Sequence, residues 1–265
     1  MESVAVGVSG GVDSGTLLAV AAGALPRDKV LALTASSVAE PPGEVDAAAD
    51  LARSLGVEHV VVDVDWLGID GIADNPPDRC YRCKRALFSR FTEVARERGS
   101  SALLEGGNTD DLGDYRPGAK ALAELGVRRP MIDAGISKAD VREIARRLGL
   151  PNADRPALAC LGSRFPYGAR LTAEAFDMAG RAEMFLRSLG LGQIRVRVHG
   201  EVARIEVEPA ALGAAMDRRV EIAARLRALG FLFVTLDLDG YRTGSQNATL
   251  PANGPGAAED GGDGR

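Results

Sequence analysis

Six residues near the N-terminus constrain the fold of this chain more than any other feature. Ser-Gly-Gly-Val-Asp-Ser, residues 9–14, follows a short apolar run over residues 4–8 and precedes a helix-favouring stretch. Two adjacent glycines let main-chain amides approach an anion without interference from a Cβ atom. A helix that begins directly after them adds further amides and a favourable dipole. The pattern therefore predicts a phosphate cradle at the carboxyl end of a parallel strand.

This loop differs from other common nucleotide-binding loops. It lacks the Gly-Lys-Ser/Thr ending of a Walker loop and the Gly-x-Gly-x-x-Gly of a dinucleotide-binding fold. A tight turn that carries serines by chance is the alternative interpretation. SGGVDS is the signature of PP-loop enzymes, and the chain resembles them. The resemblance implies that ATP is cleaved between its α and β phosphates, that pyrophosphate stays in the loop, and that the substrate becomes adenylated.

Carboxylates near the loop are candidates for holding the metal that accompanies ATP. Phosphate sites of this kind typically use Mg²⁺, which prefers oxygen ligands. Asp13 lies inside the loop, whereas Asp110 and Asp111 follow residues 106–109 at the end of another strand-like run. We expect Asp13 to take part in catalysis, and a solvated turn is the alternative for all three. The residues assigned to ATP or pyrophosphate are Ser9, Gly10, Gly11, Asp13, Ser14, Asn108 and Asp110.

The first half of the chain alternates strand and helix signals. Strand-like runs cover residues 4–8, 30–34, 60–64 and 101–104, and helical patterns cover residues 17–22, 44–55, 84–98 and 137–148. This alternation predicts a parallel sheet covered on both faces. The second half has the order helix, strand, strand, long helix from Pro209 to Gly230, and strand. We therefore expect an α/β fold of the PP-loop type, with a doubly wound parallel sheet and a smaller C-terminal α+β domain.

Composition and boundaries complete the outline of the chain. We expect a PP-loop domain over residues 1–157, a C-terminal domain over residues 158–250, and a disordered tail over residues 251–265, which is rich in Gly, Pro, Asp and Ala. The net charge is −5 with no basic run, which argues against a nucleic-acid partner. No run approaches the about 18 apolar residues of a membrane span, and no signal peptide is apparent. We therefore expect a cytoplasmic protein with no membrane partner.

The chain has three cysteines, an odd number in a chain too large to need disulfides for stability. Cys80 and Cys83 form a Cys-x-x-Cys pair, whose spacing suits one metal or a redox dithiol. Cys160 lies near the expected domain junction. Three thiolates are one short of a Cys₄ zinc site but suit a [4Fe–4S] cluster with one open iron. Zinc-bound or unliganded thiols remain alternatives at this point.

Several long segments occur in an order that resembles the LarE family. They are NPPDRCYRCK from residue 75, GGNTDDLGDYRPG from 106, SKADVREIARRLGLPNADRPALACLGSRFPYG from 137, RVRVHGEVARIEV from 195 and LDLDGYRTGSQN from 236. The resemblance covers about residues 3–247. It implies an ATP-dependent sulfur transferase that helps to build the nickel-pincer nucleotide cofactor of lactate racemase, and a homo-oligomer, since family members tend to form hexamers.

The resemblance also implies a substrate and a source of sulfur. Each carboxylate of a pyridinium dicarboxylate mononucleotide is adenylated, and sulfur then displaces AMP to leave a thiocarboxylate. One type of family member gives away the sulfur of the cysteine that matches Cys160, which becomes dehydroalanine. The other type binds a [4Fe–4S] cluster through three cysteines and delivers a sulfide. Because Cys80, Cys83 and Cys160 are all present, the chain is similar to the second type, in which Cys160 is a ligand.

An arginine-rich hairpin is expected near the end of the chain. Residues 195–199 and 202–207 alternate strictly around Gly200-Glu201, which is compatible with a two-residue type II′ turn. In that register Arg195 lies opposite Glu206 and Arg197 lies opposite Arg204, all on one face. A solvated sheet face is one interpretation, and a phosphate-binding face is the other. By resemblance, Arg195, Arg197, Glu183 and Glu206 line the substrate phosphate region, and Arg164 is a further candidate for substrate or AMP.

Three other functions are weighed against the cofactor-building transferase. A tRNA thiolase needs a basic recognition surface, which the acidic composition disfavours. An amide-forming synthetase needs a source of ammonia, and no glutaminase segment is present. It would also have no use for three cysteines together. A nucleotide-binding regulatory module without catalysis is the third alternative, and it would release no pyrophosphate from ATP.

Overall fold

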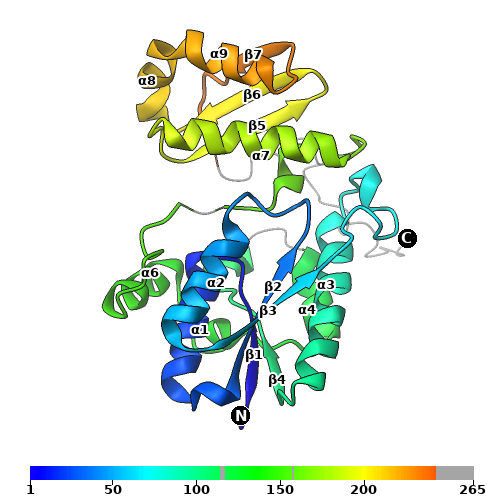
Figure 1. Ribbon diagram of the computed structural model, residues 1–265, viewed down its shortest axis with the longest axis vertical. Coiled ribbons are helices and arrows are strands. Elements are labelled where there is room, and N and C mark those ends of the chain that lie inside the picture. Colours follow the sequence, from blue (N-terminus) through cyan, green and yellow to red (C-terminus); the bar gives the residue numbers. More distant parts are fainter. Residues whose placement is uncertain (114–116, 157, 243–265) are drawn as a thin grey trace, which may run out of the picture.

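The computed structural model describes residues 1–113, 117–156 and 158–242, which form two sheets with their own helices (Figure 1). The larger sheet comes from the first half of the chain and the smaller one from the second half, as the sequence predicts. The tail over residues 251–265, expected to be disordered, lies outside the described residues. Across the described ranges, no helix combines the length and the apolar character needed to cross a membrane.

The larger sheet has four parallel strands in the order β3-β2-β1-β4. They are β1 (Val4–Gly7), β2 (Val30–Ser36), β3 (Glu58–Asp63) and β4 (Ala102–Leu104). The chain moves outward from β1 to β3 and then returns to the other side of β1 with β4. Open α/β sheets bind ligands in the crevice at such a reversal. The loops that follow β1 and β4 therefore flank the expected ligand site.

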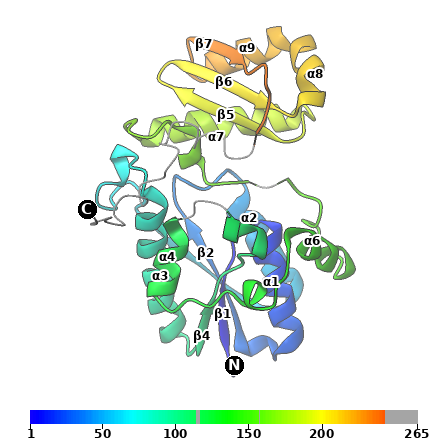
Figure 2. The ribbon, with the colours of Figure 1, turned by 180° about the vertical axis from the view of Figure 1, so that it is seen from behind.

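Helices cover both faces of this sheet (Figures 1 and 2). The helices of one face are α1 (Val12–Ala24), α2 (Glu44–Leu55) and α6 (Lys138–Arg147), and those of the other are α3 (Arg79–Glu97) and α4 (Pro117–Glu124). The alternation of β1 explains this layering, since Val4 and Val6 pack in the first core and Ala5 packs with Phe88 and Phe91 in the second. The predicted doubly wound sheet is confirmed.

The smaller sheet has the order β5-β6-β7, with β5 and β6 antiparallel and β6 and β7 parallel. Its elements are α7 (Ala173–Ser188), β5 (Ile194–His199), β6 (Val202–Val207), α8 (Leu212–Asp217), α9 (Arg219–Ala228) and β7 (Phe233–Leu236). Its core also takes Ala39, Trp66 and Ile72 from the first half of the chain. The two halves therefore share contacts, and the boundary at residue 157 stays a prediction.

Two helix predictions need correction. The single long helix expected from Pro209 is a 3-10 turn over Pro209–Ala211 followed by α8 and α9, with a break at Arg218. Helix α3 begins at Arg79 and not near residue 84, so Cys80 and Cys83 lie in its first turns. The short elements that remain are α5 (Pro130–Asp133), η1 (Arg27–Lys29), η2 (Ile72–Asp74), η3 (Thr109–Gly113) and η4 (Leu161–Arg164).

Candidate active site

The glycine-rich loop has the predicted position between β1 and α1. The Ser14 hydroxyl accepts a hydrogen bond from the Ser9 amide at 3.1 Å and lies 3.2 Å from the Ser9 hydroxyl. These bonds close the loop on itself, while Gly11 forms the N-cap of the 13-residue helix α1. The amides at this N-terminus and the helix dipole point to where an anion would lie.

Gly10 is required by the local geometry. Its φ of +78° lies in the left-handed region, which side chains other than glycine rarely adopt. A Cβ atom at Gly10 would also lie 2.8 Å from the main-chain oxygen of Glu44. On the other side of the loop, a Cβ at Gly106 would lie 2.8 Å from the Cα of Ser14. The loop is therefore held tightly between the start of α2 and the segment after β4.

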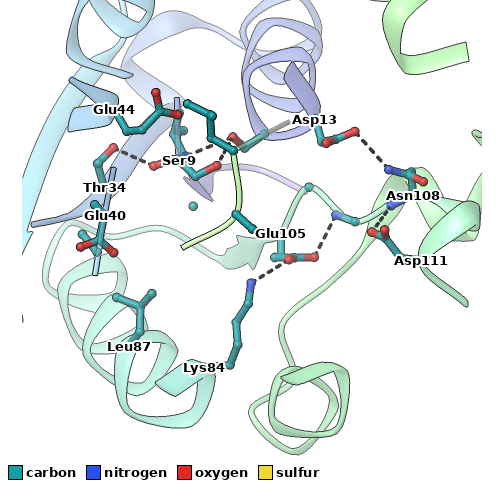
Figure 3. A pocket seen from close by; sticks show the side chains of 18 of the residues that line it. Ser9, Asp13, Thr34, Glu40, Glu44, Lys84, Leu87, Glu105, Asn108 and Asp111 are labelled. Carbon is teal, nitrogen blue, oxygen red and sulfur yellow. Dashed lines mark hydrogen bonds and ion pairs between the residues drawn. The ribbon is translucent and has the colours of Figure 1, made fainter. Parts of the chain in front are cut away.

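Asp13 is the central carboxylate of the phosphate end (Figure 3). It accepts a hydrogen bond from the Asn108 side-chain amide at 3.1 Å, and it forms an ion pair with Lys138 at the start of α6. The main-chain amide of Lys138 also reaches Asp110 at 3.4 Å. Three segments far apart in the sequence thus meet at Asp13. The predicted residues Asp13, Asn108 and Asp110 are brought together, while Lys138 is a site residue that the sequence did not single out.

The start of α6 explains the position of Lys138. Ser137 is its N-cap, and the Ser137 hydroxyl accepts from the Asp140 amide at 3.2 Å. The Asp140 carboxylate in turn accepts from the Ser137 amide at 2.9 Å, which completes a capping box. The cap fixes where the helix begins, and Lys138 is its first residue. Lys138 is therefore held with its ammonium group at the phosphate end.

One continuous cavity of about 990 Å³ joins the phosphate loop to the second half of the chain. It is lined at one end by Ser9 and Asp13 and at the other by Ala159, Arg195 and Tyr241. Its middle lies along apolar side chains of α3 and the carboxyl end of β2. These middle residues are Thr34, Ala35, Leu87, Phe88 and Phe91. The cavity is large enough for a nucleotide together with a second small molecule.

Two acidic side chains on the α2 side of the cavity are partly desolvated. Burial raises the pKa of Glu40, although the Ser37 hydroxyl that donates to it acts in the opposite direction. Burial likewise raises the pKa of Glu44, and Arg155, which forms an ion pair with it, opposes that effect. Both carboxylates line the cavity. Neither was singled out in the sequence, because no motif distinguishes them from ordinary loop and helix acids.

Lys84 and Glu105 form a second polar contact inside the cavity (Figure 3). The Lys84 ammonium lies 2.9 Å from Glu105, which also accepts from the Gly107 amide at 2.9 Å. Burial alone would raise the pKa of Glu105, but Lys84, the Gly107 amide and Arg129 together bring that pKa below its ordinary value. Lys84 directly follows Cys83 in sequence, so the helix that carries the cysteine pair also contributes to the cavity wall.

The three cysteines lie near one another although Cys160 is far from the pair in sequence. Cys80 and Cys160 are exposed and Cys83 is half-buried. Burial raises the pKa of the Cys83 thiol to about 12, and the charges of Cys160 and Cys80 add to the increase. The Trp66 indole N–H lies 3.1 Å from the Cys83 sulfur. No His, Cys, Asp or Glu cluster among the described residues closes around a single metal ion.

The arginine hairpin has the predicted register. Arg195 pairs with Glu206 and Arg197 with Arg204 across β5 and β6. Gly200 has a φ of +60°, as the first position of a type II′ turn requires. The solvated-face alternative is wrong, because Arg195, Arg197 and Glu206 are 4%, 6% and 1% exposed. This face is therefore buried against other parts of the protein.

Buried ion pairs occupy that face. Glu206 accepts from Arg197 at 2.8 and 3.0 Å and from Arg204 at 3.2 Å. Glu183 on α7 accepts from Arg164 at 2.6 and 2.9 Å, and both side chains are fully buried. The Arg164 guanidinium also donates to the Cys160 carbonyl at 3.3 Å. Arg164 thus connects the cysteine loop to α7.

Only one of these predicted substrate residues reaches the cavity wall. Arg195 lines the cavity, and its guanidinium lies 5.1 Å from the Tyr241 ring. Burial lowers the pKa of Arg195 to about 10, and nearby Arg164 adds to that decrease. Arg164, Arg197, Glu183 and Glu206 lie behind it in the ion pairs. Their direct contact with substrate stays a prediction, whereas their contacts fix the segments that carry Cys160 and Arg195.

Another residue missed by sequence reasoning connects the domain junction to the phosphate loop. The Asn152 side-chain amide donates to the carbonyl groups of Gly10 and Gly11 at 3.2 and 3.1 Å. It is 7% exposed and lies two residues beyond Leu150, after the end of α6. An asparagine after a helix gives no sequence signal for such a contact. The contact fixes the carbonyl side of the loop, which leaves its amides directed at the anion site.

Comparison with known proteins gives two levels of similarity. A family model described as NAD synthase matches residues 1–98, which contain the phosphate loop and the first three strands. The NH(3)-dependent NAD(+) synthetase of Pyrobaculum aerophilum is 31% identical over 156 residues, 56% of this chain and 57% of that protein. This level of similarity is confined to part of the chain.

Two relatives match nearly the whole length. Pyridinium-3,5-bisthiocarboxylic acid mononucleotide synthase of Lactiplantibacillus plantarum is 41% identical over 250 residues, which cover 94% of this chain and 91% of that protein. The protein slr1717 of Synechocystis sp., whose function is uncharacterised, is 40% identical over 252 residues, 94% of each chain. The similarity therefore extends over both sheets. It also includes the positions of all three cysteines.

Proposed function

The chain belongs to the LarE family of PP-loop proteins, and on that premise we propose that it is an ATP-dependent sulfur transferase. Its substrate would be pyridinium-3,5-biscarboxylic acid mononucleotide, and its product the corresponding thiocarboxylate. The observation that carries this proposal is the single cavity that runs from Ser9 to Arg195. The neighbours of two cysteines, Lys84 and Ala159, line that cavity. A nucleotide and a carboxylate substrate would therefore share one cavity, next to the segments that carry the cysteines.

The first step would join the substrate carboxylate to AMP. A carboxylate oxygen attacks the α-phosphorus of ATP, the bond from that phosphorus to the bridging oxygen breaks, and pyrophosphate leaves with its charge. The amides at the start of α1 bind the departing pyrophosphate, because they are unpaired donors at the positive end of a helix. Lys138 lies beside them and offsets the developing negative charge.

Mg²⁺ fits the donors present at this end. Asp13 and Asp110 offer carboxylate oxygens to the cavity beside the loop, and Mg²⁺ in such sites is held by one or two carboxylates together with phosphate oxygens. When bound, the ion would neutralise phosphate charge and orient the leaving group. Asp13 would then exchange part of its contact with Lys138, which becomes free to meet a phosphate oxygen.

The second step would replace AMP by sulfur. A sulfide attacks the carbonyl carbon of the acyl-adenylate, the bond from that carbon to the AMP oxygen breaks, and AMP leaves as its anion. Arg195 is suited to hold the mononucleotide phosphate, since guanidinium groups bind phosphate through two parallel hydrogen bonds. Arg164 and Glu183 would keep the Cys160 loop at a fixed distance from it. A second round would convert the other carboxylate.

A [4Fe–4S] cluster is the sulfur carrier that we favour. Burial raises the pKa values of Cys80 and Cys83, and the nearby charge of Cys160 adds to both increases. An iron centre that takes three thiolates would offset this repulsion. A cluster spans more space than one ion and suits thiols on two separate segments. When bound, it would supply an open iron that holds an exchangeable sulfide. The alternative is that the exposed Cys160 gives away its own sulfur once.

Anaerobic purification with iron and sulfide analysis tests this route, combined with intact mass after turnover. We expect iron and sulfide in the wild type and no loss of the elements of H₂S. The Cys80→Ala variant should release pyrophosphate but lose repeated turnover, because only the carrier is damaged. A colourless protein that loses the elements of H₂S would establish the sacrificial route. ADP formation, or no pyrophosphate with the correct acceptor, would overturn the transferase itself.

Three further expectations belong to this proposal. A homo-oligomer, by family resemblance a hexamer, is expected and can be checked by light scattering of the purified protein. Cytoplasmic location stays a prediction. The family's dependence on a small nucleotide agrees with the absence of a basic run in the chain, so no nucleic-acid partner is expected.

A further inference from the structure

Arg79 is a buried arginine next to the cysteine pair. It is the first residue of α3 and directly precedes Cys80, and it is only 3% exposed. Its guanidinium donates to the Gly162 carbonyl at 2.8 Å and to the Asn75 side chain. It also lies 5.7 Å from the centre of the Tyr167 ring. All of these partners are uncharged.

Two buried arginines of the second half, Arg164 and Arg197, have acidic partners. Arg164 is held by Glu183 and Arg197 by Glu206, each through two hydrogen bonds. Within the described parts of the chain, Arg79 has no carboxylate within ion-pair distance. Burying a charge without an opposite charge is costly, so proteins pair such groups or bind an anion there. Among the described residues, Arg79 therefore has no negatively charged partner that would offset the cost of its burial.

The start of α3 adds positive potential at the same place. This 19-residue helix has no acidic residue in its first turn, and its N-cap Asp78 makes no side-chain capping bond. Asp78 instead forms an ion pair with Arg82, at 2.9 Å. The amides at a helix N-terminus favour an anion. A buried guanidinium and an uncapped helix end therefore both face the segment where Cys80 begins the cysteine pair.

Arg79 also connects the two segments that carry the cysteines. The Gly162 carbonyl that it binds lies two residues after Cys160. A Cβ atom at Gly162 would lie 3.3 Å from Arg79 and 3.4 Å from Trp66, so the loop is packed closely against both. Trp66 reaches Cys83 through its indole N–H. The positive charge of Arg79 is thereby fixed between Cys80 and the loop of Cys160.

We propose that Arg79 is the counter-charge of an anionic sulfur centre held by Cys80, Cys83 and Cys160. The inference rests on the proposed function and deepens it. Three thiolates around a [4Fe–4S] core would carry net negative charge, and a sulfide on the open iron would add to it. Arg79 stabilises the most negative, sulfide-loaded form. It is a positioning residue that favours an anionic sulfur donor, and it need not touch the substrate.

The test compares Arg79→Gln, Arg79→Lys and Arg82→Gln in the full-length, reconstituted protein. Arg82 is a matched control, because it lies in the same segment but is more exposed and already paired with Asp78. Sulfide is titrated into each protein and followed by the visible spectrum of the cluster, and the reduction potential is measured in parallel. Unfolding of the iron-free proteins is the second measurement, since it reports any purely structural role of Arg79.

We expect Arg79→Gln to bind sulfide about tenfold more weakly, since one charge at short range is lost. Its potential should shift to more negative values, because added electrons are less stabilised. Arg79→Lys should recover most of the sulfide affinity and of the reduction potential. The sulfide affinity of Arg82→Gln should stay within about twofold of wild type, because exposed paired charges contribute little. If the Gln variant does not fold, Arg79→Met takes its place, because it also removes the charge while keeping an unbranched side chain. The same weaker sulfide binding and more negative potential are then expected, and wild-type values in Arg79→Met would end the role of Arg79.

Three other outcomes would overturn the inference, and the measurements distinguish them from one another. A wild type that holds no iron would end both the cluster proposal and the role of Arg79. A wild type that holds iron, with the same sulfide affinity and potential in Arg79→Gln, would end the role of Arg79 alone. Equal changes in Arg79→Lys and Arg79→Gln, accompanied by loss of stability in the iron-free protein, would assign Arg79 a structural role only.

Discussion

The two ends of the cavity are built in different ways. The phosphate end rests on main-chain geometry, with a left-handed glycine, a helix N-terminus and amides that need no side chain. The cysteine and arginine end rests on side-chain charges, such as the fully buried Arg164 and Glu183, which come from segments 19 residues apart. Main-chain donors at the first end would accept any nucleotide phosphate, whereas the proposed contacts of the second end would select the acceptor.

This difference predicts how each end responds to substitution. Changes at the charged end should act mainly on stability, because removing one partner leaves the other charge buried. Changes at the main-chain end should act mainly on rate, because small displacements of the loop misplace the phosphates. Three substitutions test this contrast, each with a control inside the same molecule where the chain offers one.

The largest effect is expected for Glu183→Gln. It leaves Arg164 without its anion and also weakens the contact to Arg187 at 3.6 Å. Breaking such a buried pair costs about 3–5 kcal/mol. We expect this loss in the free energy of unfolding, measured by urea titration with a check that the m-value is unchanged.

Glu143→Gln is the control for that substitution. Glu143 also contacts two arginines, Arg146 and Arg147, but its side chain is 50% exposed. Exposed pairs of this kind are worth at most about 1 kcal/mol. A Glu183→Gln protein as stable as the Glu143→Gln protein would show that the buried charges do not hold the second sheet together.

The two ends also differ in how far the sequence predicted them. The loop and the register of Arg195 were both predicted, because each depends on residues close in sequence. The solvated alternative for the arginine face is wrong, since burial depends on which segments cover the hairpin. The sequence of residues 195–207 alone does not show which segments pack against the hairpin.

The missed residues have one physical property in common. Lys84, Lys138 and Asn152 each act through a partner more than 20 residues away in sequence. Periodicity and capping rules report only near neighbours, so they place such residues on helices without showing what they contact. The early start of α3 was missed because Pro76 and Pro77 read as a loop and no acidic residue marks its first turn.

Gly10→Ala should have the second largest effect, on rate. Alanine at a φ of +78° is strained by about 1–2 kcal/mol, and its Cβ would meet the Glu44 carbonyl oxygen. The loop must shift, and we expect pyrophosphate release to fall on the order of 100-fold. A continuous pyrophosphate assay with the pyridinium substrate measures this.

Gly23→Ala is the control for Gly10→Ala, in the helix that follows the loop. Gly23 lies within α1, and a Cβ there would meet nothing within 4 Å. Alanine should therefore stabilise the helix by roughly 0.5–1 kcal/mol and leave the rate unchanged. Equal rates for Gly10→Ala and wild type would remove main-chain geometry as the basis of the phosphate end.

The smallest effect concerns the partly buried contact between Lys84 and Glu105 in the cavity. Lys84, Arg129 and the Gly107 amide hold the pKa of Glu105 below its ordinary value of 4.5. A depressed carboxyl pKa gives stability that is present above pH 4.5 and is lost as the pH falls through the lower, folded value. Because Lys84 is 34% exposed, solvent screening limits this contribution to about 1 kcal/mol.

Glu105→Gln should therefore be less stable than wild type by about 1 kcal/mol at pH 7. The difference should shrink below pH 4.5, where the unfolded wild type also takes up a proton. Urea titrations of both proteins between pH 7 and the acid transition measure it. A difference that stays constant with pH would mean that packing of the Glu105 side chain, and not its charge, matters there. Packing and geometry, and not charge, would then determine stability in the middle of the cavity, as they do at the phosphate end.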